Sequence, residues 1–490
     1  MSDTKAGART TPVLGGNQKL VVAIAVLASF VSFLDGTIVN VALPKMIGEL
    51  GGGLTAQQWI VDSYLVTLGA FILVAGSVSD LYGRILVMRI GLILFGVASV
   101  AVGAAPTVEF LIGARAVQGI AGALLVPSSL ALITSNIRGA AQGRAIGIWT
   151  GMTSVAMIVG PVIGGLFVDL LNVGTVSGWR FAFFINVIPI AVVLWLLVRL
   201  GQRDVRKPGV RIDYLGSILC TVGLAGVVFA LIEQQSLGWG NPAIWGSMTI
   251  GVLSFAGFLV REKYAKDPVM PLGLFRARNF WTGNVATAFI YGALALSSFA
   301  IGVYLQEGPK LPATLAGVAS LPSTIIMILF SSRVGSWSGR FGPRLFMTIG
   351  PITCGIGVVT MLLVQHDFNY WWQMLPGIIL FGVGLTLTVS PLTSAILGAI
   401  EPERSGIASA VNNAVSRVAG LIMTALLGLI TGGALNLDGF HRTVVVMAAL
   451  LIAGGLVSWA GIRNHLSRGN DQSAVETGEP KSEAAAAAQG

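Results

Sequence analysis

Long apolar runs separated by short polar segments organise this chain of 490 residues. Runs of about 20 residues recur to its end, and that is the length an α-helix needs to cross the hydrocarbon core of a bilayer. Residues 1–19 are polar, and residues 464–490 are polar and then alanine-rich, so we expect a cytoplasmic N-terminal segment and a disordered cytoplasmic tail. The pattern between them predicts fourteen membrane-spanning helices, at residues 20–43, 55–78, 85–104, 107–133, 143–168, 181–200, 213–233, 243–260, 280–305, 312–333, 345–365, 371–397, 404–431 and 440–462.

The composition agrees with a membrane protein rather than a soluble one. The chain is 54% hydrophobic and 10% charged, whereas soluble domains carry about 25% charged residues. The first apolar run is too long for the core of a cleaved signal peptide, so we interpret it as the first membrane helix. Both cysteines, Cys220 and Cys354, fall in predicted spans. A disulfide framework or a metal cluster is therefore not expected, and no cofactor is implied.

The basic residues predict the orientation of the chain. Of the 30 Lys and Arg residues, most lie in segments on the side of the N-terminus. The exceptions are Lys45, Arg180, Lys310 and Arg442 on the opposite side, and Arg115 and Arg417 inside spans. Because cytoplasmic loops carry the excess of positive charge, both termini are expected in the cytoplasm and the protein in the plasma (inner) membrane of a bacterium. The net charge of +9 is then explained without nucleic-acid binding.

An internal repeat divides the chain. The segment "GSVSDLYGR" (76–84) follows the second predicted span, and "GSWSGRFGPR" (335–344) follows the tenth. This spacing predicts two related six-helix bundles, residues 20–200 and 280–463, with two inserted helices and basic flanking loops within 201–279. Two related bundles are the plan of secondary transporters, whose substrate path lies at the interface between the repeats.

Several motifs of the N-terminal half resemble those of one transporter family. They are "LDGTIVNVALP" (34–44), "GSVSDLYGRILVM" (76–88), "LIGARAVQGIAGA" (111–123), "GPVIGG" (160–165) and "WRFAFFINVIP" (179–189). Together they are similar to the signatures of the major facilitator superfamily, specifically its fourteen-helix drug:proton antiporters.

The resemblance implies the major facilitator fold, all-α, with two six-helix bundles plus two inserted helices. It also implies multidrug efflux by proton-coupled antiport of amphipathic, cationic drugs or toxic compounds through alternating access. The implied partners are a small-molecule substrate, protons and membrane lipids, with a monomer expected and no nucleic acid.

Three buried charges are the candidates for proton coupling. Asp35 and Arg115 each lie about 12 Å below the outer boundary of their spans, and Asp62 about 10 Å below. Charges inside a membrane are rare and usually face a cavity or each other. We expect Asp35 to be the main proton carrier, with Asp62 assisting or contacting a cationic substrate. The alternatives are a permanent Asp35–Arg115 or Asp35–backbone lock, and an interfacial role for Asp62.

Other polar groups complete the predicted transport site. Arg115 is always charged, and the resemblance implies that it organises the proton site together with Gln118. Arg417, with Asn412 and Asn413 about one helical turn away, gives the thirteenth span a polar face. That face is interpreted as cavity lining, with a contact at the cytoplasmic mouth as the alternative. Tyr291 is a candidate for substrate stacking, although aromatic residues more often mark the membrane interface.

Two glycine-containing motifs are the candidates for gating. In the loop motif, Gly76 and Gly83 permit a tight turn, Asp80 can cap a helix end, and Arg84 can bind headgroups or a carboxylate. The resemblance implies a latch between the bundles on the cytoplasmic side, and a plain tight loop is the alternative. The C-terminal copy has Gly339 where Asp80 stands.

The fifth predicted span carries the second gating motif. Its members, Gly160, Pro161, Gly164 and Gly165, are expected to thin and bend the helix so that it packs closely and hinges. Helix packing without a hinge is the alternative.

Other classes of function have less support in the sequence. The three histidines, His366, His441 and His465, are scattered without metal-ligand spacing, and no phosphate-binding Walker loop is present. We therefore expect neither an enzyme nor an ATP-driven pump. An exporter or flippase of a lipid, a metabolite or a self-made antibiotic on the same fold is the alternative function.

Overall fold

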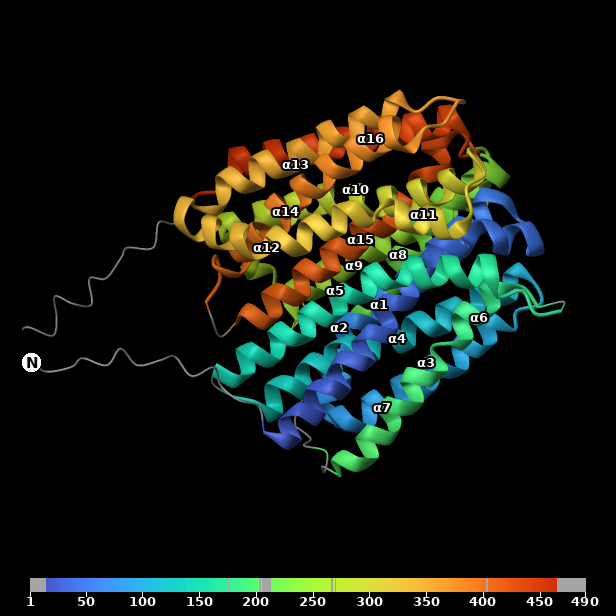
Figure 1. Ribbon diagram of the computed structural model, residues 1–490. Helices are drawn as coiled ribbons and strands as arrows, with labels where there is room; N and C mark the ends of the chain where they lie inside the picture. The colour runs from blue at the N-terminus through green and yellow to red at the C-terminus, as the bar shows by residue number, and fades with distance from the viewer. Residues whose placement is uncertain are drawn as a thin grey trace, which may run out of the picture.

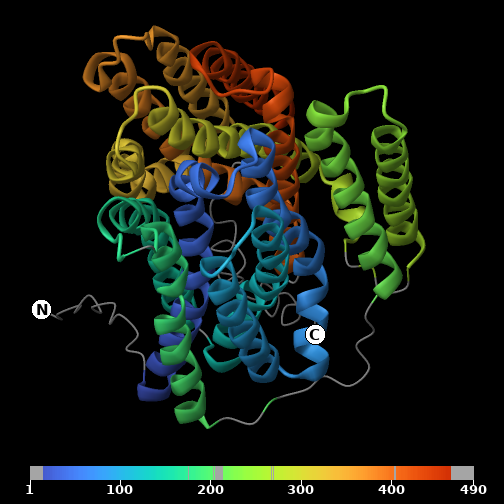
Figure 2. The same ribbon diagram turned by 90° about the vertical axis from the view of Figure 1, so that its right-hand side faces the viewer.

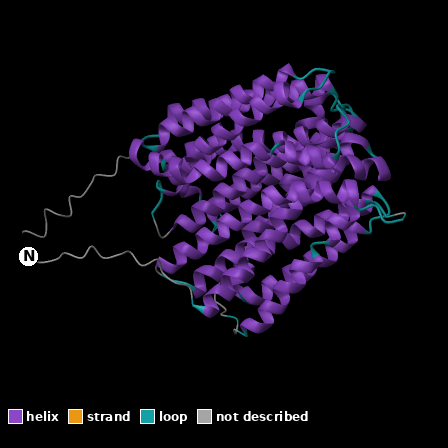
Figure 3. Ribbon diagram, in the orientation of Figure 1, coloured by secondary structure: helices purple, strands orange, loops and turns teal. Residues whose placement is uncertain are grey.

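A computed structural model describes residues 15–138, 140–174, 176–201, 204, 213–265, 268, 270–401 and 404–464. Over these residues Figure 3 shows helices joined by loops and turns, without a β-strand. Among the described residues thirteen helices are long and apolar enough to cross a membrane, and a bent pair within residues 53–82 raises the number to as many as fourteen. The prediction of an all-α polytopic membrane protein is confirmed. The expected N-terminal segment and C-terminal tail lie, apart from their innermost residues, outside the described residues.

The helices follow the predicted spans closely. The first half contains α1 (Gly16–Leu50), α2 (Gly53–Tyr82), α3 (Arg84–Gly103), α4 (Val108–Asn136), α5 (Ala140–Leu170), α6 (Gly178–Phe184) and α7 (Val187–Leu200), followed by α8 (Tyr214–Leu237) and α9 (Pro242–Tyr264). The second half contains η1 (Leu272–Arg276), α10 (Arg278–Glu307), α11 (Ala313–Ala319), α12 (Leu321–Phe341), α13 (Pro343–Thr360), η2 (Met361–Leu363), η3 (Tyr370–Met374), α14 (Leu375–Leu397), α15 (Ser405–Thr431) and α16 (Leu437–Gly461).

Two helical bundles lie side by side in Figure 1, α1–α7 in blue to green and α10–α16 in yellow to red. We call them the N-bundle and the C-bundle. The chain enters α1 at Gly15 and leaves α16 towards Asn464 at the same end of the molecule. The charge bias predicts that this end is cytoplasmic, so we call it the inner face and the opposite end the outer face.

The bundles share a hydrophobic core near the outer face. Val39, Leu43 and Met46 from the outer half of α1 belong to the same buried cluster as Ala300 and Val303 from α10. The inner half of the N-bundle has a separate core built from α1, α2, α3, α4, α5 and α7. The two bundles are therefore held together at their outer ends.

Hydrogen bonds between the bundles also lie near the outer face. Among the described residues they all involve outer halves of helices, and the partners are Asn40–Ser298, Gln57–Glu307, Gln58–Thr424, Gln58–Ala425, Gln306–Val41, Asp169–Ala313 and Asp169–Thr314. The Asp169 carboxylate at the end of α5 accepts from the backbone N–H groups of Ala313 and Thr314 at 3.1 and 2.7 Å. It thus caps the N-terminus of α11, where a negative charge is favourable.

The inserted helices α8 and α9 form a hairpin beside the two bundles, seen in light green in Figure 2. Trp59 of α2 donates to Glu233 of α8 at 2.7 Å, and Gln235 of α8 donates to Gln58 of α2 at 3.2 Å. Gln58 in turn donates to the Thr424 carbonyl of α15 at 2.7 Å. The hairpin is therefore joined to the place where α2 of the N-bundle meets α15 of the C-bundle.

The repeated loop has the same geometry in both bundles. Gly83 and Gly342 adopt positive φ angles of 107° and 84°, and each donates its N–H to a serine carbonyl four residues earlier. A Cβ atom at either glycine would collide with a capping side chain, Asp204 at Gly83 and Asn464 at Gly342. Asp204 accepts from two N–H groups at the start of α3, and Asn464 accepts from one at the start of α13. Glycine is therefore required at both turns.

One detail of the loop prediction is wrong. Gly76 was expected to take part in the tight turn, but it lies inside α2, because the helix continues to Tyr82. A Cβ atom at Gly76 would meet nothing within 4 Å, so neither a positive φ nor close packing requires glycine there. The turn is made at Gly83 alone.

The glycine motif of α5 packs against α1 of its own bundle and against α11 of the C-bundle. A Cβ atom at Gly160 would collide with Thr37 of α1 on one side. On the other side, Gly165 faces Thr314 of α11, and the Pro161 carbonyl lies against Gly317 of α11. Because glycine has no side chain, the outer half of α5 approaches the C-bundle so closely that the backbones of the two helices are in contact.

We expect Gly165→Val to push the outer ends of the bundles apart. An added Cβ would lie 2.5 Å from Thr314 Cα and 2.7 Å from its nitrogen, and backbone atoms of a helix cannot move aside singly. The distance between spin labels at Leu170→Cys in α5 and Leu363→Cys in η2, both exposed positions, should increase. Gly151→Val in the same helix is the control, because nothing lies within 4 Å of its Cβ position. Unchanged distances in Gly165→Val would contradict the packing.

Candidate functional site

A buried charge pair lies within the N-bundle. Arg115 of α4 donates through Nη1 to Asp35 Oδ2 of α1 at 2.5 Å, and the exposed fractions of these two side chains are 1% and 0%. Gln118 of α4 and Asn186, which precedes α7, both donate to Asp35 Oδ1, at 2.8 and 3.0 Å. Both carboxylate oxygens of Asp35 therefore accept hydrogen bonds, and the negative charge is neutralised by a guanidinium.

Further partners fix the guanidinium and the two amides. Arg115 Nε donates to the Ile60 carbonyl of α2 at 3.2 Å, and its guanidinium carbon lies 4.4 Å from the centre of the Tyr64 ring. Ser99 of α3 accepts from Gln118 at 2.8 Å and from Asn186 at 3.3 Å. The Asp35–Arg115 pair is thus held by groups from five parts of the N-bundle. These groups supply the hydrogen bonds that two buried charges need in place of water.

Asp62 does not join this network, although the depth argument placed all three charges in one layer. Ile60 and Tyr64, two residues before and after it on α2, both face Arg115, so helix geometry directs Asp62 to the opposite side. Gln58 and Val66, one turn away in each direction, contact α15 and α8. Asp62 therefore lies at the junction of α2 with α15 and α8. Its side chain is fully buried, and neither carboxylate oxygen accepts a hydrogen bond from a described residue.

Arg417 of α15 lies on the other side of the same junction. Its Nε atom is buried and donates to no described residue, and Leu421, one turn further along α15, packs in one cluster with Val66 of α2. On the N-bundle side of α2, Tyr64 lies against a different cation, Arg115. The ring of Tyr64 is held by a hydrogen bond of 3.0 Å between its hydroxyl and Ser32.

The remaining predicted substrate residues have different surroundings. Asn412 donates to Asn284 at 3.2 Å and to Thr287 at 2.8 Å, so its side chain is directed into the C-bundle towards α10. Asn413 is exposed, and Tyr291 of α10 packs against the large core cluster. Asn412 is therefore turned away from the predicted polar face, whereas Asn413 and Arg417, four residues apart on α15, lie on one face of the helix, and their role in lining a cavity stays a prediction.

The loop-motif charges bind within the N-bundle. Arg84 Nη2 donates to Asp80 at 3.1 Å, and Nη1 donates to the Ala131 carbonyl of α4 at 2.9 Å. These bonds fix the end of α2 on α4, at the inner face. The latch to the C-bundle that the resemblance implies stays a prediction.

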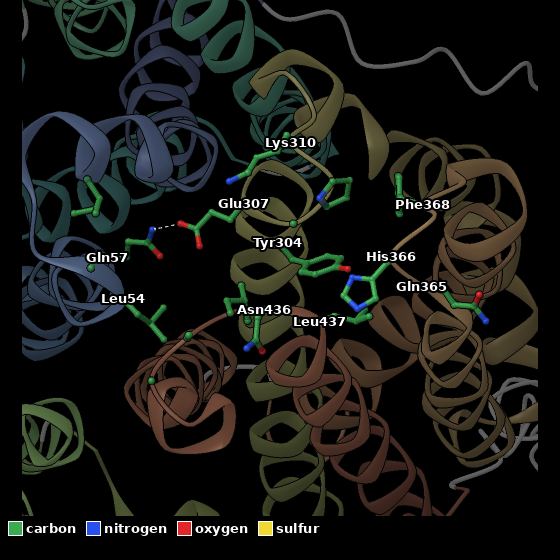
Figure 4. Close-up of a pocket in the computed structure, with 17 residues that line it drawn as sticks. Leu54, Gln57, Tyr304, Glu307, Lys310, Gln365, His366, Phe368, Asn436 and Leu437 are labelled. Carbon is green, nitrogen blue, oxygen red and sulfur yellow. Dashed lines mark hydrogen bonds between the residues drawn. The ribbon is translucent and has the colours of Figure 1, made fainter.

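A pocket of about 590 Å³ opens at the outer face between the bundles. Figure 4 shows its lining from the start of α2, the end of α10 and two loops of the C-bundle. Charged and polar side chains in it include Gln57, Glu307, Lys310, His366 and Asn436. Gln57 Nε2 donates to Glu307 Oε1 at 2.7 Å across the bundle interface.

Several of these contacts were not anticipated from the sequence. Asn186 lies inside the motif "WRFAFFINVIP" (179–189), and the available signal was a single amide side chain in an otherwise apolar stretch. Ser99 stands in an apolar span without a nearby charge in the sequence, and Tyr64, although two residues from Asp62, gave no indication that it would face Arg115 instead. Among the described residues, no group of three or more His, Cys, Asp or Glu side chains is placed to hold a metal ion.

Two helical bundles joined at one face, with buried charges inside one bundle and at the junction, define a membrane transporter. The family model of the Major Facilitator Superfamily matches residues 25–424. The chain therefore belongs to the Major Facilitator Superfamily.

Curated relatives extend over most of the chain. The methylenomycin A resistance protein of Bacillus subtilis (strain 168) is 30% identical, over 91% of this chain and 94% of the relative. The multidrug resistance protein Stp of Mycobacterium tuberculosis (strain CDC 1551 / Oshkosh) is 32% identical, over 82% of this chain and 74% of the relative. The tetracenomycin C resistance and export protein of Streptomyces glaucescens is 31% identical, over 87% and 79%. The resemblance to drug-exporting members of the superfamily is confirmed.

Solved structures confirm the fold. A bacterial homologue of the human lysosomal transporter Spinster, in an inward-facing and unoccupied conformation, gives a TM-score of 0.67 at 14% identity, covering 91% of this chain and 97% of that chain. The inward-open xylose transporter XylE from E. coli gives a TM-score of 0.64 at 14% identity, covering 92% and 98%.

Proposed function

We propose that this protein is a secondary active exporter that couples the outward movement of amphipathic, cationic drugs to the inward movement of protons. It acts as a monomeric transporter rather than an enzyme, in the plasma membrane, with both termini in the cytoplasm. The resistance and export functions named for its relatives support drug efflux. Proton coupling is supported by two buried carboxylates, Asp35 within the N-bundle and Asp62 at the junction of α2 with α15.

Asp62 is the better candidate for the exchangeable proton, and this reverses the order expected from the sequence. Burial of an ionised carboxylate without a partner is costly, whereas a protonated carboxyl group carries no charge. Asp62 has no partner among the described residues, while both oxygens of Asp35 are satisfied and its charge is balanced by Arg115. The unpartnered Asp62 carboxyl group between α2 and α15 is the single observation that carries the proposal.

The position of Asp62 fits a coupling role. Helices α2 and α15 belong to different bundles, and they meet near the outer face through Gln58. Rocking of the bundles changes this contact and with it the access of Asp62 to water. In the described arrangement the outer ends are joined, so Asp62 releases its proton and cargo loads on the inner face before the change to the outward-open state.

Dye transport into everted vesicles tests the proposal. A pH gradient imposed with acid inside should drive uptake of ethidium, and a protonophore should abolish it, if cationic drugs leave the cell in exchange for protons. Vesicles without the protein give the background. Ethidium uptake that is unchanged by the protonophore, or that stays at the background level under the gradient, would contradict the proposal.

Among the alternative cargoes, which are a lipid, a metabolite or a self-made antibiotic, an antibiotic is supported by the name of one relative. The relative from Streptomyces glaucescens is described as a tetracenomycin C resistance and export protein. Gradient-driven efflux of a neutral antibiotic, with no movement of ethidium, would support this alternative.

A further inference from the structure

The outer pocket combines two unused hydrogen-bond acceptors from different bundles. Gln57 is 2% exposed and lines the pocket, and its Oε1 atom accepts no hydrogen bond from a described residue. The orientation of its amide is fixed, because Nε2 donates to the Glu307 carboxylate at 2.7 Å. The second carboxylate oxygen of Glu307 likewise accepts no hydrogen bond from a described residue. An acceptor pair that includes a carboxylate attracts a cationic donor.

The walls of the pocket suit an apolar group attached to that cation. Tyr304 lines the pocket and is held by stacking on Phe440, with the ring centres 4.1 Å apart. Phe368 lines it from the loop before η3, and Leu437 from the start of α16. The volume of about 590 Å³ is that of a small-molecule site.

The other charged or titratable groups of the pocket are Lys310 and His366. Lys310 is exposed, and it forms no ion pair with Glu307 among the described contacts. Its positive charge weakens the field of Glu307 without occupying the carboxylate. Lys310 also has a positive φ of 59°, a conformation that Asn tolerates best after Gly.

We propose that this pocket is an amine-binding site on the outer face. A primary ammonium group donates to Gln57 Oε1 and to the free oxygen of Glu307, and its apolar part packs against Tyr304 and Phe368. Because Gln57 belongs to the N-bundle and Glu307 to the C-bundle, a bound amine joins the two bundles at the outer face. External amines therefore favour the outward-closed state and inhibit the transport cycle from outside. Binding of the amine does not depend on which cargo the protein exports.

Titration of the purified full chain in lipid nanodiscs tests the site, since both faces are then accessible. The probe is benzylammonium, and neutral benzyl alcohol is the matched ligand without charge. Glu307→Gln keeps the hydrogen bond to Gln57 but removes the charge, so benzylammonium should bind about tenfold more weakly by calorimetry. Lys310→Asn removes the opposing charge at a compatible backbone position, and binding should tighten about twofold to threefold. Asp367→Asn is the control, because Asp367 lies in the same loop as His366 and does not line the pocket.

The consequence for the bundles is measured separately. Benzylammonium should shift the distance between spin labels at Leu170→Cys and Leu363→Cys towards short values in the wild-type background, and not in Glu307→Gln. The native cysteines are buried and should not be labelled. Equal affinity of the wild type and Glu307→Gln, or tighter binding of benzyl alcohol than of benzylammonium, would overturn the site. Binding without any shift in distance would overturn its action on the bundles.

Discussion

Arg115→Leu is expected to cause one of the largest losses of stability among single substitutions in this protein. It leaves Asp35 as a buried carboxylate without a counter-ion, in a pocket whose other partners are neutral amides. Removal of one partner of a buried pair costs about 3 to 5 kcal/mol. The midpoint of thermal unfolding in detergent, followed by tryptophan fluorescence, should fall strongly, and less folded protein should be recovered from membranes.

The double variant Asp35→Asn with Arg115→Leu separates the charge effect from loss of packing. With both charges gone, part of the stability should return, so the double variant should be more stable than Arg115→Leu alone. Arg404→Gln is the control, since Arg404 and Glu401 form an exposed ion pair, and such pairs contribute less than about 1 kcal/mol. A double variant no more stable than Arg115→Leu would contradict a mutual Asp35–Arg115 lock.

The membrane spans were predictable because each needs only a local property, about 20 apolar residues in succession. The loop glycine Gly83 was predictable for a related reason, since a tight turn between two spans requires a residue that tolerates positive φ. Breaks inside a span were not predictable in this way. The predicted span 181–200 consists of α6 and α7, and 312–333 consists of α11 and the start of α12, although hydropathy joins each pair into one span.

The candidate site was only partly predictable, because depth along a helix can be counted but rotation about its axis cannot be inferred for helices that are apolar all round. Depth brought Asp35 and Arg115 together correctly as a possible lock. It also grouped Asp62 with them, whereas the 100° rotation per residue of an α-helix directs Asp62 away from Arg115. The same limitation applies to Asn412, which faces α10.

The role of the inserted helices also required the structure. From the sequence, residues 201–279 were an insertion of unspecified location. The hydrogen bonds of Glu233 and Gln235 place α8 against Trp59 and Gln58. Asp62 is one turn from Gln58 and from Val66, which packs against α8, so the inserted hairpin lies next to the candidate proton carrier at the α2–α15 junction.

Asp62→Asn is expected to abolish proton-driven accumulation of cargo while leaving exchange intact. Asparagine resembles the protonated carboxyl group in shape and is neutral at every pH, so the substituted junction should fold and move but can no longer carry a proton. In proteoliposomes, a gradient of one pH unit stores about 1.4 kcal/mol per proton and supports about a tenfold accumulation. Ethidium accumulation should fall to the level seen without a gradient. Exchange of labelled for unlabelled ethidium at equal pH should continue.

Two further variants test whether the loss of ethidium accumulation is caused by the missing Asp62 carboxyl group itself. Ser63→Ala removes a neighbouring buried hydroxyl that also has no partner among the described residues, so accumulation should be retained. Asp35→Asn removes the charge that balances Arg115, so it should reduce stability together with both accumulation and exchange. If Asp35→Asn instead stopped accumulation alone and Asp62→Asn left it unchanged, the exchangeable proton would reside on Asp35. The Asp35–Arg115 pair would then have to open during each cycle.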